Sequence, residues 1–370
     1  MDEQDYRLLD EGQIITPALI FYKDYIEENI QTAIQIAGDV GRLWPHIKTH
    51  KCADIVRMMV SHGIRKFKTA TIAEAEMVAK CGAEQIILAY PLVGPNIERF
   101  LELQEVFPDV VFWAIGDDLS ALQCLGEAAE KRGLRVNLLV DVDLGMGRTG
   151  VPAEGSLEFF RACAALPGVK AGGFHCYDGH FGIPDLSKRK ELVRQTIVPL
   201  LEAQKVLRGE GIEPVLVMGG TPTFPCYAEY PDLYLSPGTC ILNDASYSEK
   251  YQDMKFRKAA VVMTRVVSHP AGGRFTLDLG YKAIGADPQP PRGVIVGRET
   301  AYRTIVQNEE HWVLEPVDKS QALPPIGTVF YVVPMHICTT CLLYPRALVA
   351  EGGKVTGAWD IAARDRKLTI

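Results

Sequence analysis

The stretch RVNLLVDVDLGMGRTGVPAEGSLEFFRACAALPGVKAGGFHCY, residues 135–177, contains the pattern that decides the fold. Its ends, Arg135–Val142 and Val169–Tyr177, are short apolar runs of the length typical of strands. Between them, Gly155–Ala165 has the amphipathic pattern of a helix. A strand, a helix and a second strand in this order predict two parallel strands joined by a right-handed crossover.

The same alternation continues on both sides of this stretch. We expect strands at Gly41–Lys48, Ile64–Ala70, Gln85–Tyr90, Val110–Gly116, Arg135–Val142, Val169–Tyr177, Glu213–Met218 and Asp232–Ser236. The helices expected after the first six strands are Cys52–His62, Ile72–Cys81, Asn96–Glu105, Leu119–Arg132, Gly155–Ala165 and Leu186–Arg208. A short irregular link follows the seventh strand, and the eighth leads to a segment near Ile241–Gln252. Eight such units in about 215 residues have the size of a (β/α)₈ barrel. A doubly wound open sheet is the alternative, but the unbroken succession favours closure.

The pattern changes on either side of this barrel. Asp24–Ala37 predicts a helix before the first barrel strand, and Thr16–Tyr22 predicts a separate strand. After about Lys255, short alternating runs separated by turn residues predict an all-β domain. These runs are Ala259–Ser268, Arg274–Leu279, Gly293–Val296, Trp312–Pro316, Thr328–Val333 and Ala347–Val349. We therefore expect a barrel domain over residues 17–255 and a β domain over residues 256–370, with residues 1–16 packing on the latter.

The composition limits the class of protein and its partners. The chain has 370 residues, 47% hydrophobic and 23% charged, as globular proteins do. Its net charge of −7 argues against nucleic acid or an anionic membrane as a partner. The polar start, Met1–Gly12, has no signal-peptide pattern, and no segment approaches the roughly 18 apolar residues of a membrane span. Nine scattered cysteines fit a reducing compartment, so we expect a cytoplasmic protein.

Chemistry in such barrels gathers at the C-terminal ends of the strands. The first strand ends in WPHIKTHK, residues 44–51, with two lysines and two histidines within six residues. A lysine in the barrel mouth can be desolvated, which suits Lys48 to Schiff-base formation with an aldehyde. The alternative is that these are ordinary surface side chains.

Two further strand ends carry candidate residues. DVDLGMGRTG, residues 141–150, is a glycine-rich loop that would place Arg148 beside an anionic oxygen, unless Arg148 is simply solvated. HCYDGH, residues 175–180, offers His175, Tyr177 and His180 for acid–base work or ring stacking. A structural role is the alternative for either histidine.

The loops after the seventh and eighth strands combine glycine with hydroxyl residues. They contain Gly219-Gly220-Thr221 and Gly238-Thr239. Loops at these two positions form the usual phosphate site of such barrels, through backbone N–H groups and hydroxyls. The pattern thus predicts a phosphorylated ligand with a lysine across the mouth. Pyridoxal 5′-phosphate (PLP) fits, and so does a sugar phosphate bound by a barrel aldolase.

A last cluster, PMHICTTC, lies at residues 334–341 of the β domain. If this segment is a strand, His336 and Cys338 face the same side. Imidazole and thiolate together are a zinc-type pair, and two ligands leave positions open for substrate. Cys341 is a possible third ligand, but its spacing puts it on the other face of a regular strand. A buried histidine beside a packed cysteine is the alternative.

Taken together, these motifs resemble the D-threonine aldolase and D-serine dehydratase family, which has the alanine-racemase-type fold of PLP enzymes. The resemblance runs from Thr16 to about Arg366. Its most specific parts are PHIKTHK at residues 45–51, the loop at residues 143–150, DLGYKA at residues 278–283 and PMHIC at residues 334–338.

The resemblance implies roles for several residues. Lys48 would hold PLP covalently and Arg148 would contact its phenolic oxygen. The phosphate would be held by Gly219, Gly220, Thr221, Gly238 and Thr239. His336 and Cys338 would bind a divalent metal, with zinc favoured over manganese or magnesium. Such enzymes are commonly homodimers.

The sequence also departs from the family pattern. Trp44 stands where relatives often have arginine, so an anion contact is lost. Cys240 stands where relatives often have tyrosine, which puts one phosphate contact in doubt. Cys338 matches the dehydratase branch, since the aldolase branch tends to have aspartate there, although residues 338–341 match neither branch closely.

The resemblance implies the activity of a lyase on small D-configured β-hydroxy amino acids. If His46 or His180 removes the hydroxyl proton, the Cα–Cβ bond breaks to give glycine and an aldehyde. If Lys48 instead removes the Cα proton, dehydration gives a 2-oxo acid and ammonia. A racemase is a rival that has no evident use for His336 and Cys338. A non-catalytic PLP carrier is a second rival, which such a β domain argues against.

Overall fold

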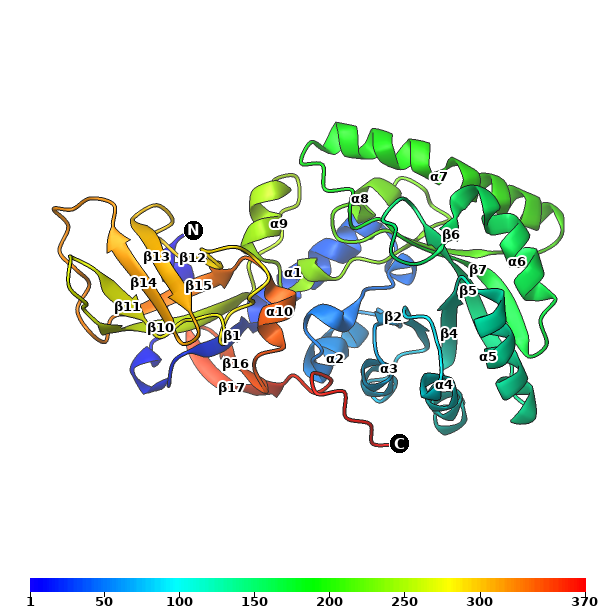
Figure 1. The fold of residues 1–370 in the computed structure, drawn as a ribbon, viewed down its shortest axis with the longest axis horizontal. Coiled ribbons are helices and arrows are strands. Elements are labelled where there is room, and N and C mark those ends of the chain that lie inside the picture. The colour runs from blue at the N-terminus through cyan, green and yellow to red at the C-terminus, as the bar shows by residue number, and fades with distance from the viewer. The chain divides into compact units, whose positions relative to one another are not determined.

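The computed structural model describes residues 1–370, which form two compact units (Figure 1). We call residues 33–48, 56–238 and 365–370 the barrel unit, and residues 1–32, 49–55 and 239–364 the β unit. The chain passes from one unit to the other at residues 32/33, 48/49, 55/56, 238/239 and 364/365. Neither unit is therefore one continuous segment.

The barrel unit is built on a parallel sheet whose strands follow one another in chain order. The strands are β2 (Lys66–Thr69), β3 (Gln85–Leu88), β4 (Val111–Gly116), β5 (Val136–Asp143), β7 (Val169–Tyr177), β8 (Val215–Met218) and β9 (Tyr234–Leu235), and the two-residue β6 (Val151–Pro152) pairs with β5. These strands and their order agree with the sequence prediction. Sequential parallel pairing follows from the alternation of apolar runs with helices.

Residues 43–46 join the two edges of this sheet. Leu43 pairs with Leu235 of β9, and His46 pairs with Lys68 of β2, both in parallel. The N–H of Trp44 donates to the carbonyl of Leu235 at 2.8 Å, and the N–H of Lys68 donates to the carbonyl of Pro45 at 2.9 Å. The sheet thus closes into a barrel. The predicted first strand, residues 41–48, is reduced to these bridges, because Pro45 has no N–H and a 3₁₀ turn begins at Ile47.

Helices follow most of the barrel strands, as Figure 1 shows from cyan to green. They are α3 (Ile72–Ala79), α4 (Pro95–Val106), α5 (Leu119–Lys131), α6 (Ser156–Ala164), α7 (Leu186–Gly209) and the short α8 (Phe224–Tyr227), while α1 (Lys23–Ala37) and α2 (Ala53–Ser61) each continue from one unit into the other. Helix α3 begins where the Thr71 hydroxyl accepts from the N–H of Glu74. The Glu74 carboxylate accepts in turn from the N–H of Ala70 at 2.7 Å. This reciprocal cap fixes the turn that follows β2.

The interior of the barrel is filled by side chains. Trp44 is 1% exposed and packs with residues from alternate positions of the strands, namely Ile87, Ile115, Leu139 and Val217. Its indole N–H donates to the carbonyl of Phe67 at 2.8 Å. The barrel is therefore a packed core, and any ligand must bind at its end.

The β unit holds a nine-stranded, mostly antiparallel sheet. Its strands are β1 (Ala18–Tyr22), β10 (Ala260–Ser268), β11 (Phe275–Leu277), β12 (Gly293–Ile295), β13 (Tyr302–Asn308), β14 (His311–Pro316), β15 (Val329–Pro334), β16 (Arg346–Glu351) and β17 (Lys354–Asp360), and its short helices are α9 (Ala245–Lys250) and α10 (Ile337–Cys341). Strands β13 and β17 were not predicted, because few of their side chains are buried and the apolar alternation is weak.

The two units are not separated by the single boundary near residue 255 that the sequence led us to expect, because each unit contains three segments of the chain. Strand β1 pairs with β10 in antiparallel and with β16 in parallel orientation, so the first residues of the chain belong to the β sheet. The N–H of Leu8 also donates to the Tyr331 hydroxyl at 3.0 Å. The separate strand predicted at Thr16–Tyr22 is therefore present as β1, which is not part of the parallel barrel sheet.

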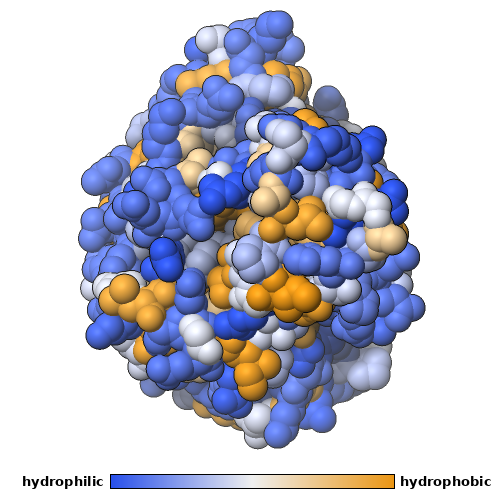
Figure 2. All heavy atoms as spheres, turned by 90° about the vertical axis from the view of Figure 1, so that its left-hand side faces the viewer, coloured by the Kyte–Doolittle hydropathy of each residue, from blue (hydrophilic) through white to orange (hydrophobic).

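The surface carries only scattered large apolar side chains. In the β unit, those exposed include Val267, Val306, Val317 and Ile326. On the face drawn in Figure 2, hydrophobic residues form small groups between hydrophilic ones. Among the helices of the chain, none combines the length and the apolar character that crossing a membrane requires.

Gly173 provides a test of the pairing between β7 and β8. Its φ is +153°, and a Cβ there would lie 1.9 Å from the carbonyl oxygen of Val215. We expect Gly173→Ala to lower the free energy of unfolding by about 3 kcal/mol or more, because backbone must move. Urea denaturation measures the change. The control is Gly209→Ala, at a helical position with nothing within 4 Å, which should be neutral or slightly stabilising. Equal midpoints for the two variants would contradict this account.

Candidate functional site

A cavity of about 520 Å³ lies at the C-terminal ends of the barrel strands. This volume is ordinary for a site that binds a small molecule. Lys68 comes from the end of β2, Tyr177 is the last residue of β7, and Arg148 follows β5. The remaining lining residues are His46, Lys48, Ala70, Ala89, Tyr90, Pro91, Val93, Thr149 and His175. Lys48, Arg148, His46, His175 and Tyr177, all predicted site residues, are thus brought together.

The lining of this cavity is cationic. Lys48 Nζ, Lys68 Nζ and the Arg148 guanidinium carbon lie 5.4, 5.7 and 5.1 Å from the centre of the Tyr177 ring. No Asp or Glu is among the lining residues. Three cations around one aromatic ring, without a lining carboxylate, favour an anionic ligand.

His175 connects Lys68 to a buried carboxylate. His175 Nδ1 is 2.8 Å from an Asp141 carboxylate oxygen, and Nε2 is 3.4 Å from Lys68 Nζ. Because the carboxylate accepts a hydrogen bond, Nδ1 carries the proton and Nε2 accepts one from Lys68. Burial alone would raise the pKa of Asp141, but the hydrogen bond from His175 lowers it. Burial, followed by the charge of Lys68, lowers the pKa of His175, so its imidazole is neutral.

Lys68 is an unusual residue for this position, since it is only 2% exposed. Burial lowers its pKa to about 7, and the charge of Lys48 acts in the same direction. The carboxylates of Asp178 and Asp141 oppose this shift. Lys68 therefore changes its charge near neutral pH.

His46 is also buried in the wall of the cavity. Its Nδ1 donates to the carbonyl of Lys68 at 2.9 Å, which leaves Nε2 as the nitrogen that can accept a proton. Burial, followed by the charges of Lys48 and Lys68, lowers the pKa of His46 well below its ordinary value. His46 is therefore neutral at physiological pH.

The predicted phosphate loops lie beside each other but are not part of the cavity lining. The N–H of Gly238 donates to the Thr221 hydroxyl at 3.1 Å, and Gly219 has a φ of +74°. A Cβ on Gly220 would lie 3.0 Å from the Tyr177 ring, and one on Gly238 would lie 2.9 Å from the carbonyl oxygen of His46. Both loops thus pack directly on residues that line the cavity, with little room for a larger side chain at either glycine.

Two predicted residues lie elsewhere. His180 is exposed and packs edge-to-face on Phe181, with 4.5 Å between the ring centres. It is not among the residues that line the cavity. Thr239 belongs to the β unit, where its hydroxyl is 3.7 Å from Cys338 Sγ.

In the β unit, His336 and Cys338 do not lie on a strand. Strand β15 ends at Pro334, and Cys338 belongs to the short helix α10. At the start of this helix, buried Asp244 accepts from the N–H of Ile337 at 3.2 Å, and the Thr340 hydroxyl donates to the carbonyl of His336 at 2.8 Å. The predicted strand geometry is therefore wrong, although the two side chains still interact.

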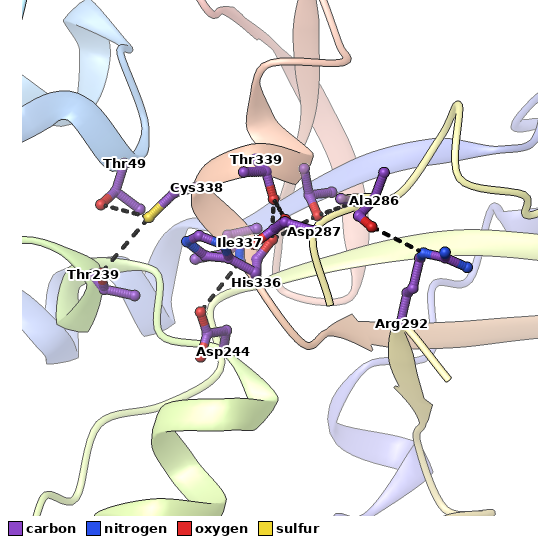
Figure 3. A network of polar contacts seen from close by, with 12 residues as sticks. Thr49, Thr239, Asp244, Ala286, Asp287, Arg292, His336, Ile337, Cys338 and Thr339 are labelled. Atoms are coloured by element: carbon purple, nitrogen blue, oxygen red, sulfur yellow. Dashed lines mark hydrogen bonds and ion pairs between the residues drawn. The ribbon is translucent and has the colours of Figure 1, made fainter. Parts of the chain in front are cut away.

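Polar groups surround this His336–Cys338 pair on both sides (Figure 3). The Thr49 hydroxyl is 3.2 Å from Cys338 Sγ, and Thr49 directly follows Lys48 in the chain. Asp287 accepts from His336 Nδ1 at 2.5 Å and from the Thr339 hydroxyl at 2.6 Å. The Cys338 side chain, and after it Asp287, raise the pKa of His336 to about 9 against the effect of burial. His336 Nε2 and Cys338 Sγ are thus the atoms available to a metal.

Cys341 does not complete a three-residue metal site. It is wholly buried, and burial raises the pKa of its thiol well above the ordinary value. The chain contains no group of three or more His, Cys, Asp or Glu side chains placed to hold a metal. Any metal on His336 and Cys338 would keep open positions, as catalytic rather than structural sites do.

Sequence reasoning missed Lys68, Asp141 and Asp287. Asp141 interrupts the apolar run of β5, and a charged residue in a buried strand is a signal that it has a partner. Lys68 stands at a strand end, as Lys48 does, and that position was its signal. Asp287 lies in a turn 49 residues before His336, and nothing in the sequence indicated their contact.

Comparison with known proteins agrees with the fold. Residues 22–244 match the family described as "Alanine racemase, N-terminal domain", and residues 259–350 match "Putative serine dehydratase domain". The 3-hydroxy-D-aspartate aldolase of Paracoccus denitrificans (strain Pd 1222) is 28% identical over 97% of this chain and 94% of its own. The structure of D-threonine aldolase from Filomicrobium marinum superposes with a TM-score of 0.87 at 26% identity, covering 96% of this chain and 98% of its own.

A dehydratase is also similar. The D-threo-3-hydroxyaspartate dehydratase of Delftia sp. (strain HT23) is 23% identical over 93% of this chain and 96% of its own. A mutant of that dehydratase, solved in a metal-free form, shares the fold with a TM-score of 0.83 at 21% identity, covering 95% of this chain and 98% of its own. The matched segments cover both the barrel and the β sheet, and the chain belongs to the alanine-racemase-type family of PLP enzymes, in the group that contains D-threonine aldolase and 3-hydroxy-D-aspartate aldolase.

Proposed function

We propose that this protein is a PLP- and divalent-metal-dependent lyase that cleaves D-configured β-hydroxy-α-amino acids to glycine and an aldehyde. The observation that carries the proposal is the cavity in which Lys48 lies among cations with no lining carboxylate. The similarity to two aldolases over nearly the whole chain supports it.

The residues of the cavity fit PLP. Lys48 supplies an amine for the aldehyde, and Arg148 a cation for the phenolic oxygen. Tyr177 and His175 supply ring surfaces. The glycine loops pack against Tyr177 and His46, beside the cavity, where backbone N–H groups of Gly219 to Thr221 and of Gly238 and Thr239 would hold the phosphate.

The His336–Cys338 pair fits a divalent metal. Nitrogen and sulfur ligands favour zinc over manganese or magnesium. Because Asp287 holds Nδ1, Nε2 of His336 would bind the metal, as in many zinc sites where a carboxylate orients the histidine.

The chemistry divides between the bound groups and the chain. When bound, PLP supplies an electron sink for charge that develops at Cα, and the metal supplies a Lewis acid for a substrate oxygen. His46, neutral and with Nε2 as its accepting nitrogen, would take the proton of the β-hydroxyl. Lys48 would release PLP to the substrate amine and recover it afterwards. His180, exposed outside the cavity, is the less suitable base.

Dehydration to a 2-oxo acid and ammonia is the second candidate function. The observation that favours it is Cys338, the residue that the dehydratase branch tends to have two positions after the metal-binding histidine. Here Lys48 would take the Cα proton, and the hydroxyl would leave.

We also propose that the protein acts as a cytoplasmic homodimer. The nine cysteines are all free thiols, which suits a reducing compartment. Light scattering of the purified protein tests the dimer.

An assay of products tests the reaction. PLP-loaded protein is incubated with D-threonine, D-3-hydroxyaspartate and D-serine, with and without a chelator. We expect glycine and the matching aldehyde, and a loss of turnover with chelator that added zinc restores. A 2-oxo acid with ammonia would establish the dehydratase instead. No product from any substrate would overturn both.

Substitution of the two histidines tests the assignment of the base. We expect His46→Gln to lower kcat by about 10²-fold or more, since a general base contributes that much. The matched control, His180→Gln, should leave kcat nearly unchanged. PLP absorbance of each variant confirms that the cofactor still binds. A larger loss in the His180 variant would reverse the assignment.

Asp287 tests the metal site without an activity assay. We expect Asp287→Asn to weaken zinc binding about 10- to 100-fold, because His336 loses the carboxylate that orients it. Competition with a chromophoric chelator measures the affinity. Asp318→Asn is the control, at an exposed carboxylate that bonds only to Ser320. Equal affinities in the two variants would exclude a role for Asp287.

A further inference from the structure

Lys68 is a buried lysine in the cavity to which the proposed reaction assigns no role. It lies in strand β2, and its side chain lines the same cavity as Lys48. Burying a charged amine costs free energy. A buried lysine is therefore either stabilised by hydrogen-bond or ionic partners, or it has a function.

The hydrogen bonds fix where the Lys68 amine lies. Asp141 holds the proton of His175 on Nδ1, so Nε2 can only accept, and Lys68 Nζ is the donor 3.4 Å away. This chain of three residues crosses the barrel from β5 and β7 to β2. The Asp141 carboxylate polarises His175, which in turn accepts a hydrogen bond from the Lys68 amine. These hydrogen bonds stabilise a buried cation at Lys68.

The charges around Lys68 do not cancel. Facing it are Lys48, Arg148 and the imidazoles of His46 and His175, together with the phenols of Tyr177 and Tyr90. Two carboxylates, Asp178 and Asp141, favour its protonated form. Asp141 accepts a hydrogen bond from His175, and Asp178 accepts from the hydroxyls of Thr223 and Tyr227 at 2.7 and 2.8 Å. Burial raises the pKa of Asp178.

The interaction between the two lysines is mutual. Lys48 disfavours the protonated form of Lys68, and an electrostatic interaction between two titrating groups acts equally on both. Their amines contact the same ring at 5.4 and 5.7 Å from its centre. A neighbouring cation is a known means of keeping a nucleophilic lysine unprotonated.

We propose that Lys68 is a positioning residue for the proton of Lys48. Its ammonium, held by His175, disfavours protonated Lys48, so that the Lys48 amine is available at neutral pH to bond with an aldehyde and to accept a proton. The proposal rests on the proposed function only in that Lys48 holds PLP, and it applies equally to the aldolase and the dehydratase reactions.

The test is a pH titration of the PLP-loaded protein by visible absorbance, which reports the protonation of the bond between PLP and Lys48 without any substrate. We expect Lys68→Met to raise the midpoint by about one pH unit or more, because one nearby positive charge is removed. Lys68→Gln, which is neutral but can still form hydrogen bonds, should shift it in the same way. If the Met variant folds poorly, the Gln variant carries the test.

Two controls separate charge from structure. Lys68→Arg keeps a positive charge at this position and should not raise the midpoint. Lys66→Met removes a lysine two residues earlier on β2, whose Nζ lies 4.7 Å from the centre of the Tyr234 ring and bonds to the carbonyl of Gly41, outside the cavity. This variant should show no shift.

Several results would overturn the proposal. They are an unmoved midpoint in both neutral variants, an equal shift in the Arg variant, or an equal shift in the Lys66 variant. A wild-type protein that binds no PLP would overturn both this proposal and the proposed function. A wild type that titrates as expected but cleaves no hydroxy amino acid would overturn the proposed function alone.

Discussion

The closure of the parallel sheet by residues 43–46 is the constraint on which the site depends. One backbone bridge to β9 and one to β2 join the edges, and the chain then turns directly into the segment that carries Lys48. Trp44 anchors this closing segment by filling the barrel interior and bonding to the carbonyl of Phe67. The position of the reactive amine is therefore set by backbone pairing and core packing rather than by a mobile loop.

The second organising feature is uncompensated positive charge. The cavity gathers Lys48, Lys68 and Arg148, while the nearest carboxylates are bonded to His175, Thr223 and Tyr227. A site arranged in this way is unfavourable without a ligand and favourable with an anionic one, so part of its selectivity is electrostatic. With Trp44 in place of the arginine that relatives often have, one expected anion contact is lost. Lys68 supplies a cation that lines the cavity.

The sequence predicted the barrel well because its strands and helices have opposite periodicities and alternate without interruption. It located Lys48, Arg148, His175 and Tyr177, since strand ends were recognisable and this fold gathers them at one end. It failed where local pattern does not determine structure. The pattern of His336 and Cys338 predicts a strand, but the segment forms a short helix whose Ile337 N–H bonds to Asp244, 93 residues away in the chain. Asp287 and Asp141 acquire their roles only through partners distant in sequence.

The five passages of the chain between its units have a consequence for how such proteins can be recombined. The first 32 residues supply the strand that lies between β10 and β16, so a cut near residue 255 would divide the β sheet between two fragments. A chimera with a relative would have to exchange three separate segments together to keep each sheet whole. Two of the crossings, at residues 48/49 and 238/239, fall inside the motifs assigned to PLP, where insertion of a linker would displace the very residues in question.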